Sequence, residues 1–574
     1  MTIKVSRVEQ LKESSRNLRG ELTAQLDNQL PYIDKDNIQI LKFHGIYQQD
    51  DRDVRKQKGK DKEYSFMVRS RIAGGELTAS QYLAHDRISD TFANGTLRLT
   101  TRQTIQLHGV IKGDLRPTLQ SLNDQMITAI GACGDIVRNI MCCPAPSSDA
   151  SQKQIMEFTR QLSDHLLPRS RAYHEIWIDG EKQLSTHETD PEHEPLYGKN
   201  YLPRKFKIGI AWPGDNCVDV FTHDIGLIAV PDERGELAGF TFVVGGGMGM
   251  NHKKKETFPR LADPLAYVPL AKTKDVVTAI VAIQRDYGDR ENRKHARFKY
   301  LVNEWGIPKL RTELERRLDY ALDPPGEIGD MTPNLHLGWN HQADGLWYLG
   351  LSVQNGRIAD TPEVQLRSGL REIIGRYQTG VRLTPNQDIL LTDIRESDRP
   401  EIEELIREHH IPHAATLSAV RKYSMACPAL PTCGLALAEA ERVFPDLIRE
   451  FERKLDGLGL EHEDISIRMT GCPNGCVRPY VADIGIVGHS LNKYDIFIGG
   501  DISGRRLNRR YKKLVELDEL VPAVQPLLEH YRNNRFNDEK FSDFMARTGA
   551  IEEFTESADT DPTQKAASES EVEA

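Results

Sequence analysis

Four of the eight cysteines gather in the last third of the chain. Cys427 and Cys433 have five residues between them, and Cys472 and Cys476 have three. The prolines and the glycine next to them predict turns, which let neighbouring thiolates converge and expose backbone amides to sulfur. Four thiolates are the ligands that a cubane 4Fe–4S cluster requires. The pattern therefore predicts such a cluster, with these four cysteines as its metal ligands.

These cysteines have two other interpretations. Structural cysteines pack as small hydrophobic side chains, but a core strand would not contain so many turn residues. A zinc module usually has two or four residues between paired cysteines, and both intervals here differ from that. Eight cysteines in 574 residues are too few for a disulfide scaffold. A non-catalytic zinc-binding module therefore stays as the alternative to the iron–sulfur cluster.

Basic side chains form a second set of residues that could do chemistry. Several stand two residues apart beside apolar residues, in stretches whose alternation is typical of strands and would place both charges on one face. A single arginine is usually a solvated surface charge, but this grouping indicates an anion-binding pocket. The set consists of Arg69, Arg71, Arg98, Arg102, Arg138, Lys205 and Lys207.

An internal duplication organises the elements that carry these residues. LRLTTRQTIQLHGV (97–110) and VRLTPNQDILLTDI (381–394) share identities at an offset of 284 residues, and the same offset places Cys143 on Cys427. Strand and helix periodicities mix in both halves, and a segment rich in Pro, Gly and Asp at 321–334 separates them. We expect a duplicated protein of mixed α and β structure.

The second copy lacks much of the basic set. Arg102 becomes Asn386, and Arg69 aligns near Gly350. We therefore expect one half to form the anion pocket and the other half to supply the cluster, without a second active site.

The motifs resemble those of a known family. MACPALPTC (425–433) and RMTGCPNGCVRPY (468–480) are similar to the signature of sirohaem-dependent sulfite and nitrite reductases, and the resemblance extends from about residue 43 to about residue 550. It implies an α+β fold with internally duplicated ferredoxin-like half-domains and two α/β domains that bind sirohaem and the 4Fe–4S cluster. The expected segments are 1–125 (N-terminal arm and first half-domain), 126–325 (first α/β domain, for sirohaem and substrate), 326–410 (second half-domain), 411–554 (cluster-bearing α/β domain) and 555–574 (disordered acidic tail).

The resemblance also implies roles for individual residues. It places Cys476 as the bridge between one cluster iron and the sirohaem iron, which couples the two cofactors electronically. Sulfite is expected to contact the catalytic residues Arg69, Arg138, Lys205 and Lys207. Sirohaem or the cluster environment is expected to contact Arg98, Thr100, Arg102, Gln106, His108 and Asn474.

The implied activity is the six-electron reduction of sulfite to hydrogen sulfide, in assimilatory sulfate reduction and cysteine biosynthesis. Nitrite reductases share the cofactors, but they typically have an asparagine where this chain has Lys207, and a dianion calls for the extra charge. FHGIYQQDDRD (43–53) and overall length favour the NADPH-linked haemoprotein. A separate flavoprotein would then donate electrons, because the chain has no Rossmann fingerprint. Residues 95–110 also resemble ferredoxin-dependent enzymes, so ferredoxin is the alternative donor.

Composition argues against several other classes of function. The net charge of −10 does not support a broad nucleic-acid or membrane-surface role. No apolar run approaches the roughly 18 residues that span a bilayer, and the N-terminus lacks the apolar core of a secretory signal. We expect a cytoplasmic protein that binds neither nucleic acid nor membrane.

Overall fold

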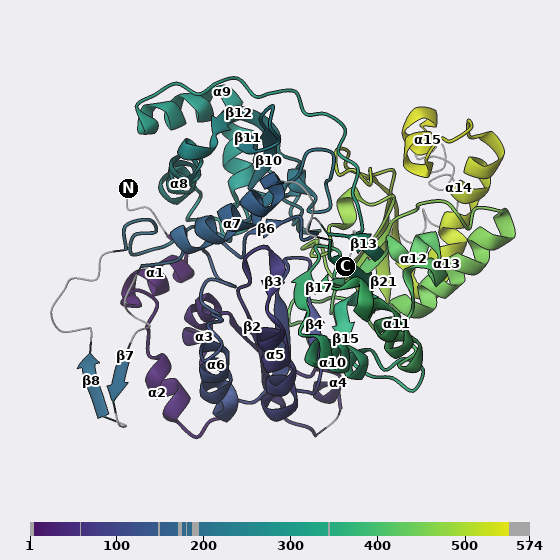
Figure 1. Cartoon of the computed structure of the whole chain (residues 1–574). Helices are drawn as coiled ribbons and strands as arrows, with labels where there is room; N and C mark the ends of the chain where they lie inside the picture. Colours follow the sequence, from purple (N-terminus) through teal and green to yellow (C-terminus); the bar gives the residue numbers. More distant parts are fainter. Residues whose placement is uncertain are drawn as a thin grey trace, which may run out of the picture. The chain divides into compact units, whose positions relative to one another are not determined.

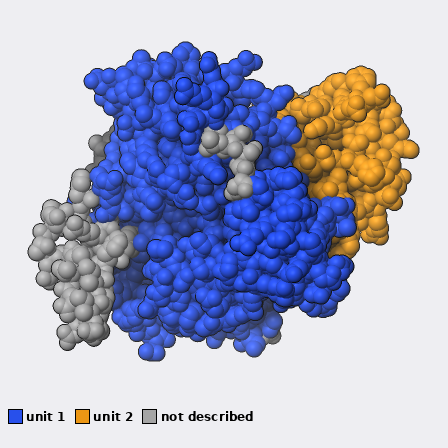
Figure 2. Space-filling view, in the orientation of Figure 1, with its two compact units in different colours: residues 1–247, 260–416 blue, residues 248–259, 417–574 orange. Residues whose placement is uncertain are grey.

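The computed structural model describes residues 5–57, 59–146, 150–169, 175–178, 181–185, 194–342 and 345–549. The chain divides into two compact units, coloured separately in Figure 2. Unit 1 comprises residues 1–247 and 260–416, and unit 2 comprises residues 248–259 and 417–574. The expected acidic tail lies outside the described residues. Within the described ranges, no helix is both long enough and apolar enough to cross a membrane.

The first sheet of unit 1 is antiparallel, in the order β1-β2-β5-β4-β15, and Figure 1 labels its strands β2, β4 and β15. Alternation separates its two faces, because Leu97 and Leu99 belong to the hydrophobic core whereas Arg98 between them points the other way. Thr78 and Gln81 form a capping box that starts its longest helix, α5. The elements are α1 (Arg7–Ser14), α2 (Leu22–Asp27), α3 (Asn37–Leu41), β1 (Ile46–Asp50), α4 (Arg52–Arg55), β2 (Tyr64–Arg69), α5 (Ala79–Phe92), β4 (Leu97–Leu99), β5 (Ile105–Val110), α6 (Leu115–Asn123) and β15 (Arg357–Ile358).

The second sheet of unit 1 has the order β13-β14-β17-β16-β3 and repeats the first. The two sheets exchange one short strand each: β15 from the second copy pairs with β4, and β3 from the first copy pairs with β16. This confirms the predicted duplication and adds the exchange to it. The elements are β3 (Glu76–Leu77), β13 (Gly338–His341), β14 (Trp347–Leu351), α10 (Leu366–Tyr377), β16 (Gly380–Leu383), β17 (Ile389–Ile394) and α11 (Arg399–Glu408).

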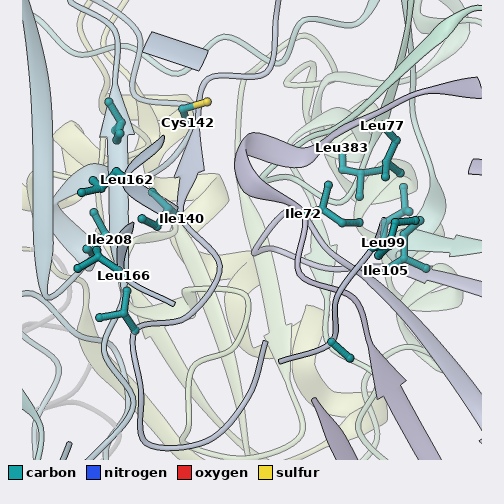
Figure 3. Close-up of a cluster of buried hydrophobic side chains, with 14 of the residues drawn as sticks. Ile72, Leu77, Leu99, Ile105, Ile140, Cys142, Leu162, Leu166, Ile208 and Leu383 are labelled. Atoms are coloured by element: carbon teal, nitrogen blue, oxygen red, sulfur yellow. The ribbon is translucent and has the colours of Figure 1, made fainter. Parts of the chain in front are cut away.

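The third sheet of unit 1 combines parallel and antiparallel pairs. β6, β9 and β10 run parallel, and β11 and β12 continue the sheet in antiparallel fashion. Leu162 of α7 and Leu166 just after this helix pack beside Ile208 of β9 (Figure 3), in a core shared with both half-domain sheets. The elements are β6 (Met141–Cys142), α7 (Ala150–His165), β9 (Ile208–Ala211), β10 (Ile225–Pro231), β11 (Leu237–Val244), β12 (Asp263–Pro269), α8 (Leu270–Tyr287), α9 (Phe298–Leu318) and a separate hairpin of β7 (Glu175–Ile178) and β8 (Glu181–Ser185).

Unit 2 contains one sheet with the same topology as the third sheet of unit 1. β18, β19 and β20 run parallel, and β21 and β22 follow in antiparallel fashion. Helix α13 buries Phe444, Leu447, Phe451 and Leu455 at helical spacing against the unit's own core. The elements are α12 (Ala419–Lys422), β18 (Met425–Ala426), α13 (Phe444–Leu458), β19 (Ile467–Thr470), β20 (Ile484–Ser490), β21 (Lys493–Ile498), β22 (Arg509–Glu516), α14 (Leu520–Asn534) and α15 (Phe541–Thr548).

Candidate functional site

The four C-terminal cysteines lie in two loops of unit 2 that follow adjacent strands. Cys427 comes directly after β18, and Cys472 comes two residues after the end of β19. Because β18 and β19 pair in parallel, both loops leave the same edge of the sheet. Gly471 lets the loops approach closely, since a Cβ there would lie 2.5 Å from the carbonyl oxygen of Ala438. We call Cys427, Cys433, Cys472 and Cys476 the four-thiol site.

Nitrogen donors contact the sulfurs of this site. The backbone N–H of Gly471 donates to Cys427 Sγ at 3.3 Å, and the side-chain amide of Asn474 donates to Cys472 Sγ at 3.4 Å. Asn474 therefore lies at the cysteines, where the sequence placed it. Cys427 and Cys472 are buried, whereas Cys476 is exposed.

The electrostatics of the four-thiol site fit a bound iron–sulfur cluster. Burial raises the pKa of Cys427 far above its usual value, and the charges of Cys476, Cys472 and Cys433 raise it further. Burial, and then the charge of Cys476, raise the pKa of Cys472 to about 12. Thiols that disfavour one another's ionisation in this way are stabilised as thiolates by cationic iron, and the N–H donors suit its sulfurs. The structure brings the four predicted ligands together, and their ligand role stays a prediction.

A row of four polar side chains, three of them cationic, crosses the first sheet of unit 1. Gln106 on β5 pairs with Arg69 on β2 and with Arg98 on β4, and Arg98 pairs with Arg357 on β15. Cross-strand partners in an antiparallel sheet share a face, so the four side chains form one line. We call Arg69, Gln106, Arg98 and Arg357 the basic row. Three of its members belong to the predicted site.

His108 lies next to the basic row and is neutral. Burial lowers its pKa far below the usual value, and the charges of Arg357, Arg98 and Arg69 lower it further. Its Nε2 is 3.4 Å from Gln106 Oε1. Adjacent guanidinium groups repel one another in a partly buried site unless an anion neutralises them. The carboxylates of a sirohaem are anions of the required kind, so these residues fit the group that the sequence implied.

Arg357 was missed by the sequence analysis. It lies more than 250 residues from Arg98 in the chain and reaches the basic row only because β15 is an exchanged strand. The repeat offers a signal that could have found it, since Ala73–Gly75 before β3 and Gln354–Gly356 before β15 form matching 3-10 turns.

Thr100 and Arg102 lie in the turn between β4 and β5 rather than in a strand, which corrects the expectation for Arg102. The guanidinium of Arg102 donates to the Ile208 carbonyl oxygen at 2.9 Å and lies 3.1 Å from His223 Nδ1. Thr100 accepts the backbone N–H of Arg102 at 3.2 Å. These contacts tie the turn to the third sheet.

Arg138, Lys205 and Lys207 also lie outside strands, so the strand expectation is wrong for them too. Their segments meet only at an isolated bridge between Val137 and Phe206, because β9 begins one residue after Lys207. Arg138 donates to the Gly134 carbonyl oxygen at 2.8 Å. The backbone N–H of Lys207 donates to Asp224 Oδ2, also at 2.8 Å.

The pKa shifts of one phenol, Tyr47, and one ammonium, Lys299, show which of these basic residues lie near them. Burial raises the pKa of Tyr47, and the charges of Arg138 and Arg69 oppose that rise, so both arginines lie near its ring. Burial, and then the charge of Arg297, lower the pKa of Lys299 to about 6, and Lys205 contributes in the same direction. Of the predicted cations, Arg69 and Arg138 thus lie near Tyr47, and Lys205 lies near Lys299.

Arg297 and Lys299 are further basic residues that the sequence analysis missed. Arg297 forms an ion pair with Asp224 at 2.8 Å, and the Lys299 ammonium donates to the Gly247 carbonyl oxygen at 3.0 Å. They stand two residues apart at the start of α9, which is the same spacing that singled out the other basic pairs.

Comparison with family models assigns most of the chain. The model described as nitrite and sulphite reductase 4Fe-4S domain matches residues 158–322 and 419–565. The model described as nitrite/sulfite reductase ferredoxin-like half domain matches residues 57–125 and 340–409. The chain belongs to the nitrite and sulfite reductase family. The paired matches confirm the predicted α+β class, with two ferredoxin-like half-domains and two α/β domains.

Full-length relatives of this family member carry two kinds of name. A ferredoxin sulfite reductase of Synechococcus elongatus is 44% identical, over 96% of this chain and 91% of the relative. An NADPH sulfite reductase hemoprotein beta-component of Staphylococcus haemolyticus is also 44% identical, over 96% of each chain. Among solved structures, the NirA protein of Mycobacterium tuberculosis has the same fold, with a TM-score of 0.76 at 24% identity over 95% of this chain and 96% of NirA.

Proposed function

We propose that this chain is the sirohaem- and 4Fe–4S-binding component of an assimilatory sulfite reductase, which reduces sulfite to hydrogen sulfide with six electrons. The observation that carries the proposal is the four-thiol site, because four converging thiols with N–H donors to sulfur suit a redox cluster. The names of the two full-length relatives support sulfite as the substrate.

The four-thiol site would hold the cluster, and Cys476 would also serve as a ligand for the sirohaem, which would couple the two redox groups. Cys476 suits that role because its thiol is exposed, whereas Cys427 and Cys472 are buried. Gln106, Arg98 and Arg357 of the basic row would bind sirohaem, with Arg357 added to the predicted residues. When bound, sirohaem and the cluster supply electron transfer to a substrate on iron.

Positive side chains of unit 1 would bind and orient sulfite. Arg69 and Arg138, which lie near one phenol, would neutralise oxygens of the dianion. Lys205 and Lys207 would add positive charge and act as proton donors when oxygen leaves as water. Lys299 lies near Lys205, and because burial lowers its pKa to about 6, its ammonium form is a stronger acid than that of an ordinary lysine.

The electron donor of the proposed enzyme is a separate flavoprotein that oxidises NADPH, in the cytoplasm and in the service of cysteine biosynthesis. Ferredoxin is the competing donor, because relatives named for each donor are equally similar to this chain. Two parallel assays of the purified protein distinguish them, one with NADPH and a sulfite reductase flavoprotein and one with reduced ferredoxin. Sulfide production with ferredoxin alone would refute the flavoprotein donor.

A donor-independent assay tests the function itself. Purified protein with reduced methyl viologen should form sulfide from sulfite and should contain sirohaem with about four further irons and acid-labile sulfide. Ammonia production from nitrite, measured in parallel, should have the lower kcat/KM. Zinc in place of iron in the four-thiol site, or a preference for nitrite, would contradict the proposal.

A further inference from the structure

A second group of metal-binding side chains lies in unit 1, apart from every residue assigned above. It consists of Cys143, Asp215, Cys217 and His336, whose ligand atoms all lie within 4.8 Å of one another. Cys143, Cys217 and His336 are buried, and Asp215 is nearly so. We call these four residues the Cys143 group.

The Cys143 group occupies the place that the four-thiol site occupies in unit 2. Cys143 directly follows β6, as Cys427 directly follows β18. Cys217 lies eight residues before β10, as Cys476 lies eight residues before β20. The residue matching Cys433 is Asp149, which lies outside the described residues. Duplication has therefore left two cysteines at equivalent positions, and different side chains complete each set.

The distances in the Cys143 group are those of a compact, single-ion site. Cys143 Sγ lies 3.3 Å from Asp215 Oδ2 and 3.3 Å from His336 Nε2, and the last two atoms are 3.0 Å apart. The other carboxylate oxygen, Oδ1, accepts the backbone N–H groups of Cys217 at 2.9 Å and Asn334 at 3.1 Å. Backbone donors thus fix the carboxylate so that Oδ2 faces the shared centre, as supporting contacts do around metal ligands.

The backbone of His336 is strained to bring its ring to this place. Its φ is +57°, which is left-handed and unfavourable for a residue with a Cβ. Gly350 makes room for it, because a Cβ at residue 350 would lie 1.9 Å from the His336 carbonyl oxygen. Strain of this kind persists where the surrounding structure imposes it, and it concentrates at ligand sites.

The Cys143 group lies in a largely apolar cluster of unit 1. Met331, Tyr348 and Leu390 pack in the same buried cluster as Cys143 and Cys217. The hydrogen bond with Cys217 lowers the pKa of Cys143 to about 7 in spite of burial, and the charge of His336 acts in the same direction.

We propose that the Cys143 group binds one divalent transition-metal ion, with zinc as the expected occupant. Two thiolates, an imidazole and a carboxylate make the mixed sulfur and nitrogen/oxygen set of four that tetrahedral zinc accepts. The ion would join three segments of unit 1: the loop after β6, the loop after β9 and the segment just before β13. Its role is structural and independent of the proposed function.

The test uses the full-length holoprotein, purified under reducing conditions and passed over a gel-filtration column with a weak chelator. Elemental analysis should find about one zinc per chain in addition to the cofactor iron. Zinc-edge X-ray absorption, which iron does not obscure, should show two sulfurs at about 2.3 Å and two nitrogen or oxygen ligands at about 2.0–2.2 Å. Cys217→Ser and Asp215→Asn should each lower bound zinc at least tenfold.

Matched controls make the result decisive. Cys133→Ser replaces another buried cysteine of unit 1 and should leave the zinc content unchanged. Absence of zinc from wild type after incubation with zinc chloride would overturn the proposal, and so would a Cys143–Cys217 disulfide found by mass spectrometry. Four sulfurs around zinc would place it in the four-thiol site instead. Only nitrogen and oxygen ligands would place it at His252, His489 and Asp495 of unit 2, which also lie close together.

Discussion

The two half-domain sheets of unit 1 share one architecture and differ in one row of side chains. Across the first sheet the row reads Arg69, Gln106, Arg98 and Arg357. Across the second sheet, the equivalent positions hold Gly350, Leu390, Arg382 and Glu76. Only the arginine of the third position is common to both sheets, at the offset of 284 that the sequence shows.

The exchanged strands decide what that shared arginine does. In the second sheet, β3 places Glu76 beside Arg382, and the two form an ion pair at 3.0 Å. In the first sheet, β15 places Arg357 beside Arg98, so a cation stands where the other sheet has an acid. The scaffold is retained in both copies, while Glu76 on one exchanged strand neutralises Arg382 and Arg357 on the other adds a cation beside Arg98.

The largest expected effect contrasts the two α/β copies. Cys476→Ser should abolish the iron–sulfur signal and displace sirohaem together, since one thiolate would serve both cofactors. Cys143→Ser, at the position equivalent to Cys427, should leave both cofactors nearly intact. Absorption and EPR spectra of the purified variants measure both effects. Loss of the cluster in Cys143→Ser with its retention in Cys476→Ser would reverse the ligand assignment.

The second-largest effect is expected when Arg357 of the basic row is replaced by the residue type at the equivalent position of the second sheet, which is Glu76. Arg357→Glu should lower sirohaem affinity by at least tenfold, because a charge-assisted contact worth about 1.5–3 kcal/mol becomes a repulsion. Haem absorbance per chain, after titration with sirohaem, gives the occupancy. The matched control is Glu76→Gln, which weakens the ion pair with Arg382 and should leave sirohaem content unchanged. Equal occupancy in Arg357→Glu and wild type would remove Arg357 from the site.

Substrate charge gives a third and smaller effect. Lys207→Asn removes one cation from the proposed sulfite site and should lower kcat/KM for sulfite by about 1.5–3 kcal/mol in transition-state free energy. Nitrite carries a single charge, so its reduction should fall much less. Steady-state kinetics with both substrates and reduced methyl viologen measure the ratio. Equal losses for the two anions would show that Lys207 does not discriminate between them.

The sequence predicts those parts of the site that depend on local spacing. The cysteines of the four-thiol site lie close together because short turns follow neighbouring strands, and Arg98 lies in a strand as its local pattern indicates, whereas Gln106 was implied by the family resemblance alone. Arg357 could not be found this way, because strand exchange is a long-range event. Local pattern misplaced Lys207 in a strand, since its N–H bonds to Asp224 rather than to a ladder partner.

The same limit applies to the Cys143 group. Cys143 and Cys217 look like isolated buried cysteines in the sequence, and the offset of 284 alone makes Cys143 a relic of the duplication. His336 comes from the link before β13, nearly 200 residues after Cys143, and its ring reaches the thiol through a left-handed backbone. Neither the strain nor the contact has a local sequence signature.

The smallest expected effect is a pH dependence confined to one copy of the half-domain. Asp388 of the second copy occupies the position of Thr104 in the first. Thr104 is fully buried with its hydroxyl 2.6 Å from that of Thr100. Burial raises the pKa of Asp388 to about 7, although the N–H of Val353 donates to its carboxylate at 2.9 Å. Between these two pKa values, the folded chain therefore holds a proton on Asp388 that the unfolded chain, with a pKa of about 3.9, has already released.

A raised carboxyl pKa stabilises the fold at low pH, and that stability is lost as the pH rises through the folded pKa. Asp388→Asn, which stays neutral, should gain about 2 kcal/mol of unfolding free energy over wild type between pH 5.5 and pH 8, at 1.36 kcal/mol per pH unit up to the pKa of about 7. Urea unfolding of both proteins at the two pH values measures the difference. Thr104→Ser in the first copy should show no pH-dependent change, because no ionisable group is altered. A constant difference between Asp388→Asn and wild type at both pH values would show that Asp388 is already ionised in the folded protein at pH 5.5.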